Sequence, residues 1–343
     1  MSTTSSILNV SYWMEGFHSF FPFYTHTCFI YFFVFFICNK YSKYERQWYH
    51  VETTQRSATI HPPPAPKYII RRGLKQIIGN WRYPLHFIDF ETVAPVIPLY
   101  PHMSPYEVFA FQFSHHTLHH GSIEVHHSTE FLHTEQGSPI VSFLKALHAA
   151  ICSNRDGGTV FQWSPHEHNV LKTMLTSPLA LEALSTQEFA DLTALVENGM
   201  VDLCKLAQKY YYVEGSDGSS SIKKLLQPTL QISKKLKSIY GSPSYNSSNF
   251  TNFQWYQTAD NGRVMDPYDI LSTIADPDYQ HGSANVTKGG AAAAAFHELQ
   301  NDDLSVKEYT AMKNSLLRYC EVDTLAMVMI FQAWQDLLDD DDS

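Results

Sequence analysis

Two acidic residues at the end of an apolar run are the first candidates for chemistry in this sequence. The stretch Leu85–Thr92 reads LHFIDFET, so Asp89 and Glu91 are two residues apart. Side chains alternate between the faces of a β-strand, which would place both carboxylates on one face. Carboxylates held so close repel each other unless a cation lies between them, and oxygen ligands of this kind suit Mg²⁺ or Mn²⁺. A lone Asp-x-Glu is also typical of a solvated edge strand, so a metal site requires further acids.

Two other segments offer such acids. Tyr319 and Asp323 lie in a long helical pattern, where a spacing of four residues puts them on one helix face. Glu167 follows an apolar strand at 159–163 and opens a helix, at the end of a strand where α/β sheets usually place their sites. In the alternative interpretation, Ser164 and Glu167 form a capping box that closes the start of this helix. About four carboxylates around ions some 4 Å apart would suit two-metal phosphodiester hydrolysis.

Three further groups of polar residues have both a functional and a structural interpretation. Asp202 is the reserve candidate for the fourth metal ligand, although a helix N-cap explains it equally. Lys223 and Lys224 belong to a basic run that could bind nucleic-acid phosphates, or could form a solvated helix face. Six histidines between His115 and His127 could bind zinc, but their spacing matches no established ligand pattern, so a solvated face is expected.

Composition limits the class of protein. The chain has 343 residues, 44% of them hydrophobic, which is ample for a packed core. Its formal net charge of −10 argues against a general polyanion binder. An enzyme that acts on nucleic acid remains compatible, since metal-site carboxylates and an acidic tail contribute to the excess. The five cysteines form no Cys-x-x-Cys pair, which argues against a zinc ribbon or iron–sulfur cluster and favours a reducing compartment.

The first 80 residues differ from the rest. Residues 1–60 form an N-terminal segment in which an apolar helix is expected at about 17–39, because residues 16–39 contain no Asp, Glu, Lys or Arg. That helix is either a membrane anchor or part of a disordered segment. The basic residues that follow it would leave the remainder of the chain in the cytoplasm. Residues 61–80 form a Pro-rich linker, and an acidic tail occupies 339–343.

Between them, the pattern predicts one α/β domain over residues 81–338. The expected strands and helices that carry the candidate residues alternate along it. Strands are expected at 85–90, 108–118, 122–128 and 159–163, and helices at 139–152, 165–175, 201–211 and 305–338, the last in one or two pieces. Residues 241–286 are rich in Ser, Asn, Gly and Tyr and predict a long irregular insertion.

The order of these motifs resembles that of DEDD exonucleases of the tyrosine subclass, which have the ribonuclease H-like fold. The region from Tyr83 to about Trp334 also resembles the bacterial family called domain of unknown function 2779. The segments that carry this second resemblance are Tyr83–Thr92, Ile97–Tyr100, Pro105–Tyr106, Phe111–Ser114, Glu130–Leu132, Val201–Leu203, Tyr210–Tyr212, Ser221–Leu226, Gly289–Ala291 and Tyr319–Met327.

The resemblance implies a mixed sheet flanked by helices. It implies that Asp89, Glu91, Glu167 and Asp323 bind two Mg²⁺ or Mn²⁺ ions and that Tyr319 orients the attacking water. Asp202 would support the site from outside, and a RecB-like nuclease is an implied partner. One departure is that DEDD exonucleases normally have Asp where this chain has Glu167. Another is that the usual Asn and Phe around that motif are here Gln162 or Trp163 and His166.

The expected function is therefore metal-dependent 3′→5′ exonucleolytic cleavage of DNA or RNA. A catalytically impaired nuclease-like scaffold, which binds nucleic acid or a partner nuclease without cutting, is the alternative, and the glutamate at position 167 supports it. The apolar segment at 17–39 by itself would suit a third class, a membrane-anchored interaction protein.

Overall fold

The structure is a computed structural model and describes residues 43–59, 67–101, 103–153, 157–274, 286, 289–300 and 304–340. The expected membrane helix at 17–39 and the prolines at 62–64 and 66 lie outside the described residues, as does the end of the acidic tail. None of the helices that the structure describes is long and apolar enough to span a bilayer.

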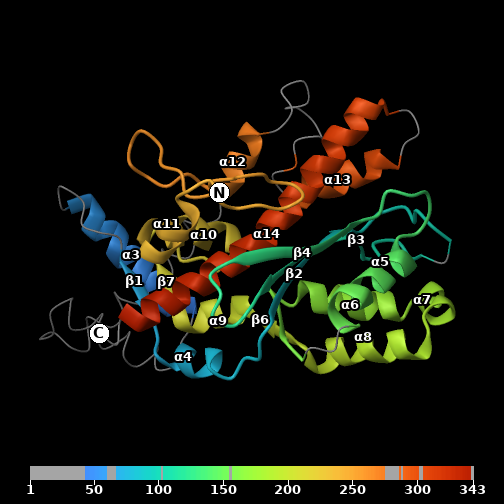
Figure 1. Cartoon of the computed structure of the whole chain (residues 1–343), viewed down its shortest axis with the longest axis horizontal. Coiled ribbons are helices and arrows are strands. Elements are labelled where there is room, and N and C mark those ends of the chain that lie inside the picture. Colours follow the sequence, from blue (N-terminus) through green and yellow to red (C-terminus); the bar gives the residue numbers. More distant parts are fainter. Residues whose placement is uncertain are drawn as a thin grey trace, which may run out of the picture.

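A five-stranded mixed sheet lies at the centre of the fold (Figure 1). Its strands are β2 (Leu85–Val93), β3 (Phe109–Leu118), β4 (Val125–Leu132), β5 (Thr159–Gln162) and β6 (Met200–Asp202). Their order across the sheet is β4-β3-β2-β5-β6, with β2, β3 and β4 antiparallel and with β5 and β6 parallel to β2. The mixed α/β sheet expected from the sequence is confirmed, and β2, which carries Asp89 and Glu91, is its central strand.

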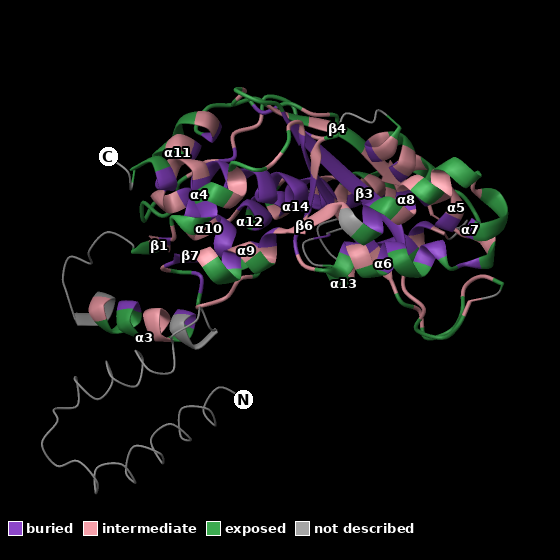
Figure 2. Cartoon of the chain, turned by 90° about the horizontal axis from the view of Figure 1, so that it is seen from below, coloured by how far each residue is buried: buried purple, intermediate pink, exposed green. Residues whose placement is uncertain are grey.

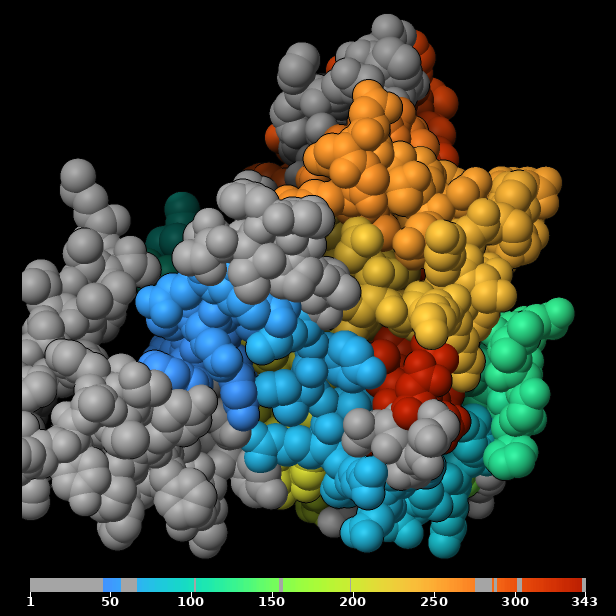
Figure 3. All heavy atoms as spheres, turned by 90° about the vertical axis from the view of Figure 1, so that its left-hand side faces the viewer, coloured from blue at the N-terminus to red at the C-terminus, as the bar shows by residue number. Residues whose placement is uncertain are grey.

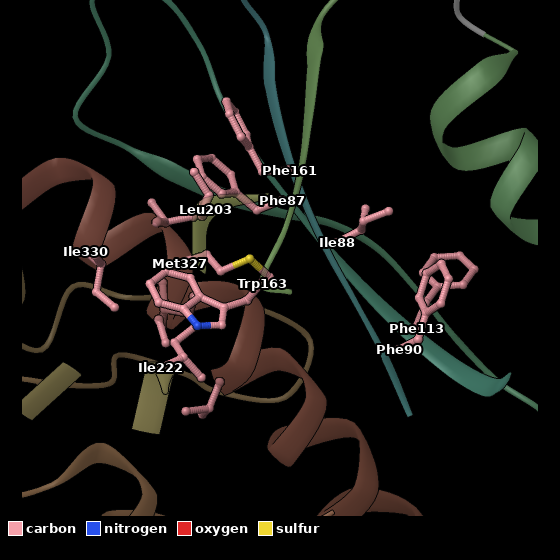
Figure 4. Packing of buried hydrophobic residues seen from close by; sticks show 14 of the residues in the cluster. Phe87, Ile88, Phe90, Phe113, Phe161, Trp163, Leu203, Ile222, Met327 and Ile330 are labelled. Atoms are coloured by element: carbon pink, nitrogen blue, oxygen red, sulfur yellow. The ribbon is translucent and has the colours of Figure 1, made fainter. Parts of the chain in front are cut away.

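The 35-residue helix α14 (Val306–Asp340) packs on one face of β2 and β3, and α5 (Ile140–Leu147) packs on the other. Every residue from Tyr319 to Trp334 is buried, as Figure 2 shows by the purple centre of the molecule. A helix segment that is enclosed on all sides needs no polar face, and this applies to the buried part of α14. Figure 4 shows Phe87 on the α14 side of the sheet and Phe113 on the α5 side, as strand alternation requires.

The other helices surround this core. They are α3 (Lys43–Thr59), α4 (Gly73–Ile78), α6 (His166–Leu175), α7 (Pro178–Ala183), α8 (Thr186–Asn198), α9 (Leu203–Tyr210), α10 (Ile222–Ile232), α11 (Lys234–Tyr240), α12 (Pro267–Thr273) and α13 (Gly289–Leu299). A π-helical turn, η1 (His148–Cys152), continues α5. Two short strands, β1 (Tyr68–Ile70) and β7 (Tyr211–Val213), form a separate antiparallel pair.

The folded body begins earlier than residue 81, which corrects the predicted domain boundary. Residues 68–78 of the predicted linker form β1 and α4. The helix α3 is joined to the body by Arg46, whose buried guanidinium donates to the carbonyl oxygens of Ala207 at 2.9 Å and Ser219 at 2.7 Å, and also to that of Tyr211. Figure 3 shows α3 in blue beside the lighter blue of β1 and α4.

Three predicted elements differ from the structure, and one of them is the strand expected at 122–128, which is observed as β4 at Val125–Leu132. The helix expected from residue 201 begins at Leu203, because residues 200–202 pair with β5 as the edge strand β6. The expected irregular insertion contains α12 and two isolated β-bridges, Tyr245 with Phe253 and Thr258 with Val264. Asp266 caps α12 by accepting from the backbone N–H of Tyr268 at 3.0 Å, and Pro267 occupies the first turn.

Candidate metal centre

The strand β2 directs Asp89 and Glu91 toward α14. Phe87, on the same face by alternation, contacts Phe331 of α14 with ring centroids 6.0 Å apart. Glu91 is 6% exposed, and a β-bulge follows it between Glu91 and Thr92. Bulges often re-aim side chains beside functional sites, and this one ends the regular alternation where the candidate site begins.

The helix α14 places three polar side chains over these acids. Ligand atoms of Asp89, Glu91 and Cys320 all lie within 4.8 Å of one another. Tyr319 and Asp323 are both contacted by one lysine ammonium, so they share a helix face as their spacing predicts. The predicted meeting of the β2 acids with this part of α14 is therefore present in the structure.

Glu167 is close enough to Asp89 and Glu91 for their charges to interact, and its carboxylate also accepts from its own backbone N–H. The backbone N–H of Ser164 donates to Asp202 Oδ1 at 3.2 Å, so the predicted capping box of Ser164 and Glu167 is wrong. Ser164 has φ of +92°, which takes it out of the extended geometry typical of an N-cap. Glu167 is 3% exposed, and no hydrogen-bond partner among the described residues contacts its Oε2 atom.

Asp202, whose charge interacts with Glu167, is a helix cap. Its Oδ1 atom accepts from the backbone N–H of Lys205 at 3.1 Å as well as from Ser164, so it is the N-cap of α9. The charge of Asp202 also raises the pKa of Glu167. The structural interpretation of Asp202 is confirmed, and its position next to Glu167 keeps it as a supporting residue of the candidate site.

Asp89, Glu91, Glu167 and Asp323 form what we term the acidic cluster. Burial raises the pKa of each of them above its ordinary value. The charge of Asp323 further raises the pKa of Asp89, and those of Asp89, Asp323 and Glu167 raise that of Glu91. Buried like charges of this kind are stabilised by protonation or by a bound cation, which is the electrostatic property of a metal site.

The two lysines that were predicted together have different surroundings. Lys223 Nζ donates to the phenol oxygen of Tyr319 at 2.7 Å and lies 3.4 Å from Asp323 Oδ2. Lys224 instead pairs with the exposed Asp217 at 3.0 Å. Only Lys223 therefore belongs to the candidate site.

Two members of the site were missed in the sequence. Tyr268 of α12 donates from its hydroxyl to Asp323 Oδ1. Cys320 is fully buried, and its thiol contacts the backbone oxygen of Asp89 at 3.6 Å. The Asp266-Pro267 pair signals a helix start, but nothing local indicates that Tyr268 reaches a residue 55 positions further along the chain.

His116 of β3 and His127 of β4 belong to a second polar group on the α14 side of the sheet, where His116 Nδ1 lies 2.7 Å from the Thr324 hydroxyl of α14. The side chain of His116 is buried and that of His127 is 3% exposed, so the solvated face expected for the six histidines is wrong for these two, whereas His119, His120 and His126 are exposed. His127 Nδ1 lies 3.4 Å from Glu321 Oε2, and its Nε2 lies 3.9 Å from Glu130. The Asn249 amide donates to both carboxylates, at 2.7 Å and 2.8 Å, and so links them by hydrogen bonds. Protein groups thus already satisfy both carboxylates of this second group.

Part of the chain matches a protein-family model. Residues 86–221 match the model of a family described as domain of unknown function (DUF2779). This supports the resemblance to that family for the region that carries Asp89, Glu91, Glu167 and Asp202, while Lys223 and α14 lie beyond it. Neither the curated proteins nor the solved structures include a match to this chain. The resemblance to DEDD exonucleases stays a prediction.

Proposed function

We propose that this protein is a metal-dependent nuclease that hydrolyses phosphodiester bonds of DNA or RNA, in the manner of a 3′→5′ exonuclease. The observation that carries the proposal is the acidic cluster, whose four carboxylates come from β2, α6 and α14 and whose charges interact with one another. The mixed five-stranded sheet with β2 at its centre is compatible with the ribonuclease H-like fold that the resemblance implies.

The residues of the acidic cluster fit Mg²⁺ or Mn²⁺. Both ions prefer carboxylate oxygens, and the cluster offers four such groups. Glu167 Oε2 is buried without a hydrogen-bond partner among the described residues, an arrangement that costs free energy unless a ligand supplies the missing interaction. Asp89, Glu91, Glu167 and Asp323 would hold the ions. Bound metal lowers the pKa of water and stabilises charge on the phosphate during hydrolysis.

The chain's own residues have separate tasks in this proposal. The Tyr319 hydroxyl accepts from Lys223, which leaves its own hydrogen to be donated to a bound water or substrate oxygen. Tyr268 holds Asp323 through a hydrogen bond to Oδ1, and so fixes the direction of that carboxylate. Asp202 accepts from the Ser164 amide, so this amide does not bind the Glu167 carboxylate.

Isothermal titration with Mn²⁺ and a cleavage assay test the proposal. The wild-type chain should bind two ions and shorten 5′-labelled single strands of DNA or RNA from the 3′ end. Asp89→Asn should abolish both properties. Asp260→Asn, an exposed acid outside the cluster, should change neither and serves as the matched control. Nucleic-acid binding without any cleavage would instead favour the impaired scaffold, and absence of Mn²⁺ binding by the wild type would contradict the metal site.

A further inference from the structure

Lys223 makes more contacts within the candidate site than a simple ion pair with Asp323 would. Its ammonium group lies 2.7 Å from the phenol oxygen of Tyr319 and 3.4 Å from Asp323 Oδ2. It also lies over the rings of Tyr319 and Tyr268, at 4.9 Å and 5.2 Å from the centroids. Two aromatic faces and a carboxylate thus surround one cation, an arrangement that favours positive charge at this point.

The position of Lys223 is unfavourable for its own helix. Lys223 is the second residue of α10, and positive charge near a helix N-terminus opposes the helix dipole. The preceding Ser221 makes no side-chain capping bond, and no acidic residue lies in the first turn. The neighbouring acidic cluster supplies the compensating negative charge. The ammonium group is therefore stabilised by the candidate site and not by its own helix.

The lysine is also the member of this group that solvent reaches. Its side chain is 40% exposed, whereas that of Asp323 is 7% exposed. Its charge acts on Asp323, Asp89 and Glu91. An incoming phosphate would therefore find an accessible ammonium group beside the carboxylates that are proposed to hold metal.

We propose that Lys223 is a catalytic residue, whose ammonium group donates a hydrogen bond to a non-bridging oxygen of the substrate phosphate. The Lys223–Asp323 pair would then be a resting contact, from which the lysine moves to the phosphate when a divalent ion binds Asp323. This inference rests on the proposed nuclease function. It separates Lys223 from Lys224, whose partner Asp217 lies at the exposed surface.

A binding experiment tests this role without relying on catalysis. Thymidine 5′-monophosphate is titrated into the full chain in the presence of saturating Mn²⁺. Lys223→Met should weaken nucleotide binding by roughly 10–100-fold, the effect expected for one charged hydrogen bond to phosphate. Lys224→Met is the matched control and should bind the nucleotide as the wild type does. In the absence of nucleotide, Lys223→Met should bind Mn²⁺ at least as tightly as the wild type, because the lysine no longer competes for Asp323.

Lys223→Arg keeps the positive charge and guards against misfolding of the methionine variant. It should recover part of the nucleotide affinity, since a guanidinium group also binds phosphate. Wild-type nucleotide affinity in both Lys223 variants would overturn the inference, as would equal losses in the Lys223 and Lys224 variants.

Cleavage assays on the same proteins distinguish this inference from the proposed function. If the wild type cuts neither DNA nor RNA, while nucleotide binding depends on Lys223, the nuclease proposal fails and the assignment of a phosphate contact stands. If Lys223→Met cuts and binds like the wild type, the assignment fails and the nuclease proposal stands.

Discussion

Replacing Glu91 by Gln should make the metal-free protein more stable, although it should remove metal binding. Glu91 is 6% exposed and lies on the central strand of the sheet. Burial and the charges of Asp89, Asp323 and Glu167 oppose its ionisation and raise its pKa, and Lys223 offsets this only in part. Glutamine has nearly the same shape and carries no charge, so it retains the packing while it removes the repulsion.

The distances in the cluster set the expected size of this effect. Ligand atoms of Asp89 and Glu91 lie within 4.8 Å of each other. Two full charges at that distance repel by about 3.5 kcal/mol at an effective dielectric constant of 20. The positive charge of Lys223 and partial protonation of the carboxyl groups reduce this value, so we expect Glu91→Gln to raise the free energy of unfolding by about 1–3 kcal/mol. For a chain of this size that corresponds to an increase of roughly 1–4 °C in Tm.

The effect should depend on pH in a defined direction. The pKa of Glu91 is higher in the folded state than the ordinary value of 4.5, so the folded protein binds its proton more tightly than the unfolded chain does. The stability linked to this proton is complete below the unfolded pKa and is lost as the pH rises through the folded pKa. The advantage of Glu91→Gln should consequently be small at pH 5 and larger at pH 8.

Thermal denaturation of both proteins with EDTA and with Mn²⁺ checks the prediction at the two pH values. With EDTA at pH 8, the variant should have the higher Tm. With saturating Mn²⁺, only the wild type should gain stability, because an ion that binds the folded state alone shifts the equilibrium toward it. The exposed Glu182→Gln should change neither curve. A lower Tm for Glu91→Gln with EDTA at pH 8 would refute the reasoning, since Glu91 would then be a net stabilising group.

Three other variants test separate parts of the structure. Tyr319→Phe should slow cleavage by roughly 10²–10⁴-fold and leave Mn²⁺ affinity unchanged, and a wild-type rate would make Tyr319 only a core aromatic residue. Glu167→Gln should weaken Mn²⁺ binding, measured by titration calorimetry, without lowering Tm. A loss of about 1 kcal/mol in the free energy of unfolding, together with normal Mn²⁺ binding, would instead support the capping role. Arg46→Met should destabilise the protein by about 3 kcal/mol, because buried carbonyl groups lose a charged donor. Urea denaturation measures this loss, and an unchanged midpoint would show that α3 is not part of the folded unit.

The element types and the central acids of this protein could be predicted from local patterns. The alternation in β2 and the four-residue spacing in α14 set side-chain directions within one element, so the pairs Asp89 with Glu91 and Tyr319 with Asp323 followed from the sequence. The limits of β5 and α6 also matched closely, because an apolar strand followed by Ser-Pro has few other interpretations. These features depend on neighbours in sequence, which is why no knowledge of the fold was required.

Contacts between distant elements were decided only by the tertiary structure. The sequence pattern of Ser164 and Glu167 favours a capping box, yet Asp202 accepts from the Ser164 amide, so this amide does not bind the glutamate. Lys223 and Lys224 are equivalent in sequence, but the packing of α10 against α14 turns one toward Tyr319 and the other toward solvent. Tyr268 reaches Asp323 from a segment that the composition predicts as irregular. Local spacing states which way a side chain points from its own backbone, and only the packing of helices and strands determines what it meets there.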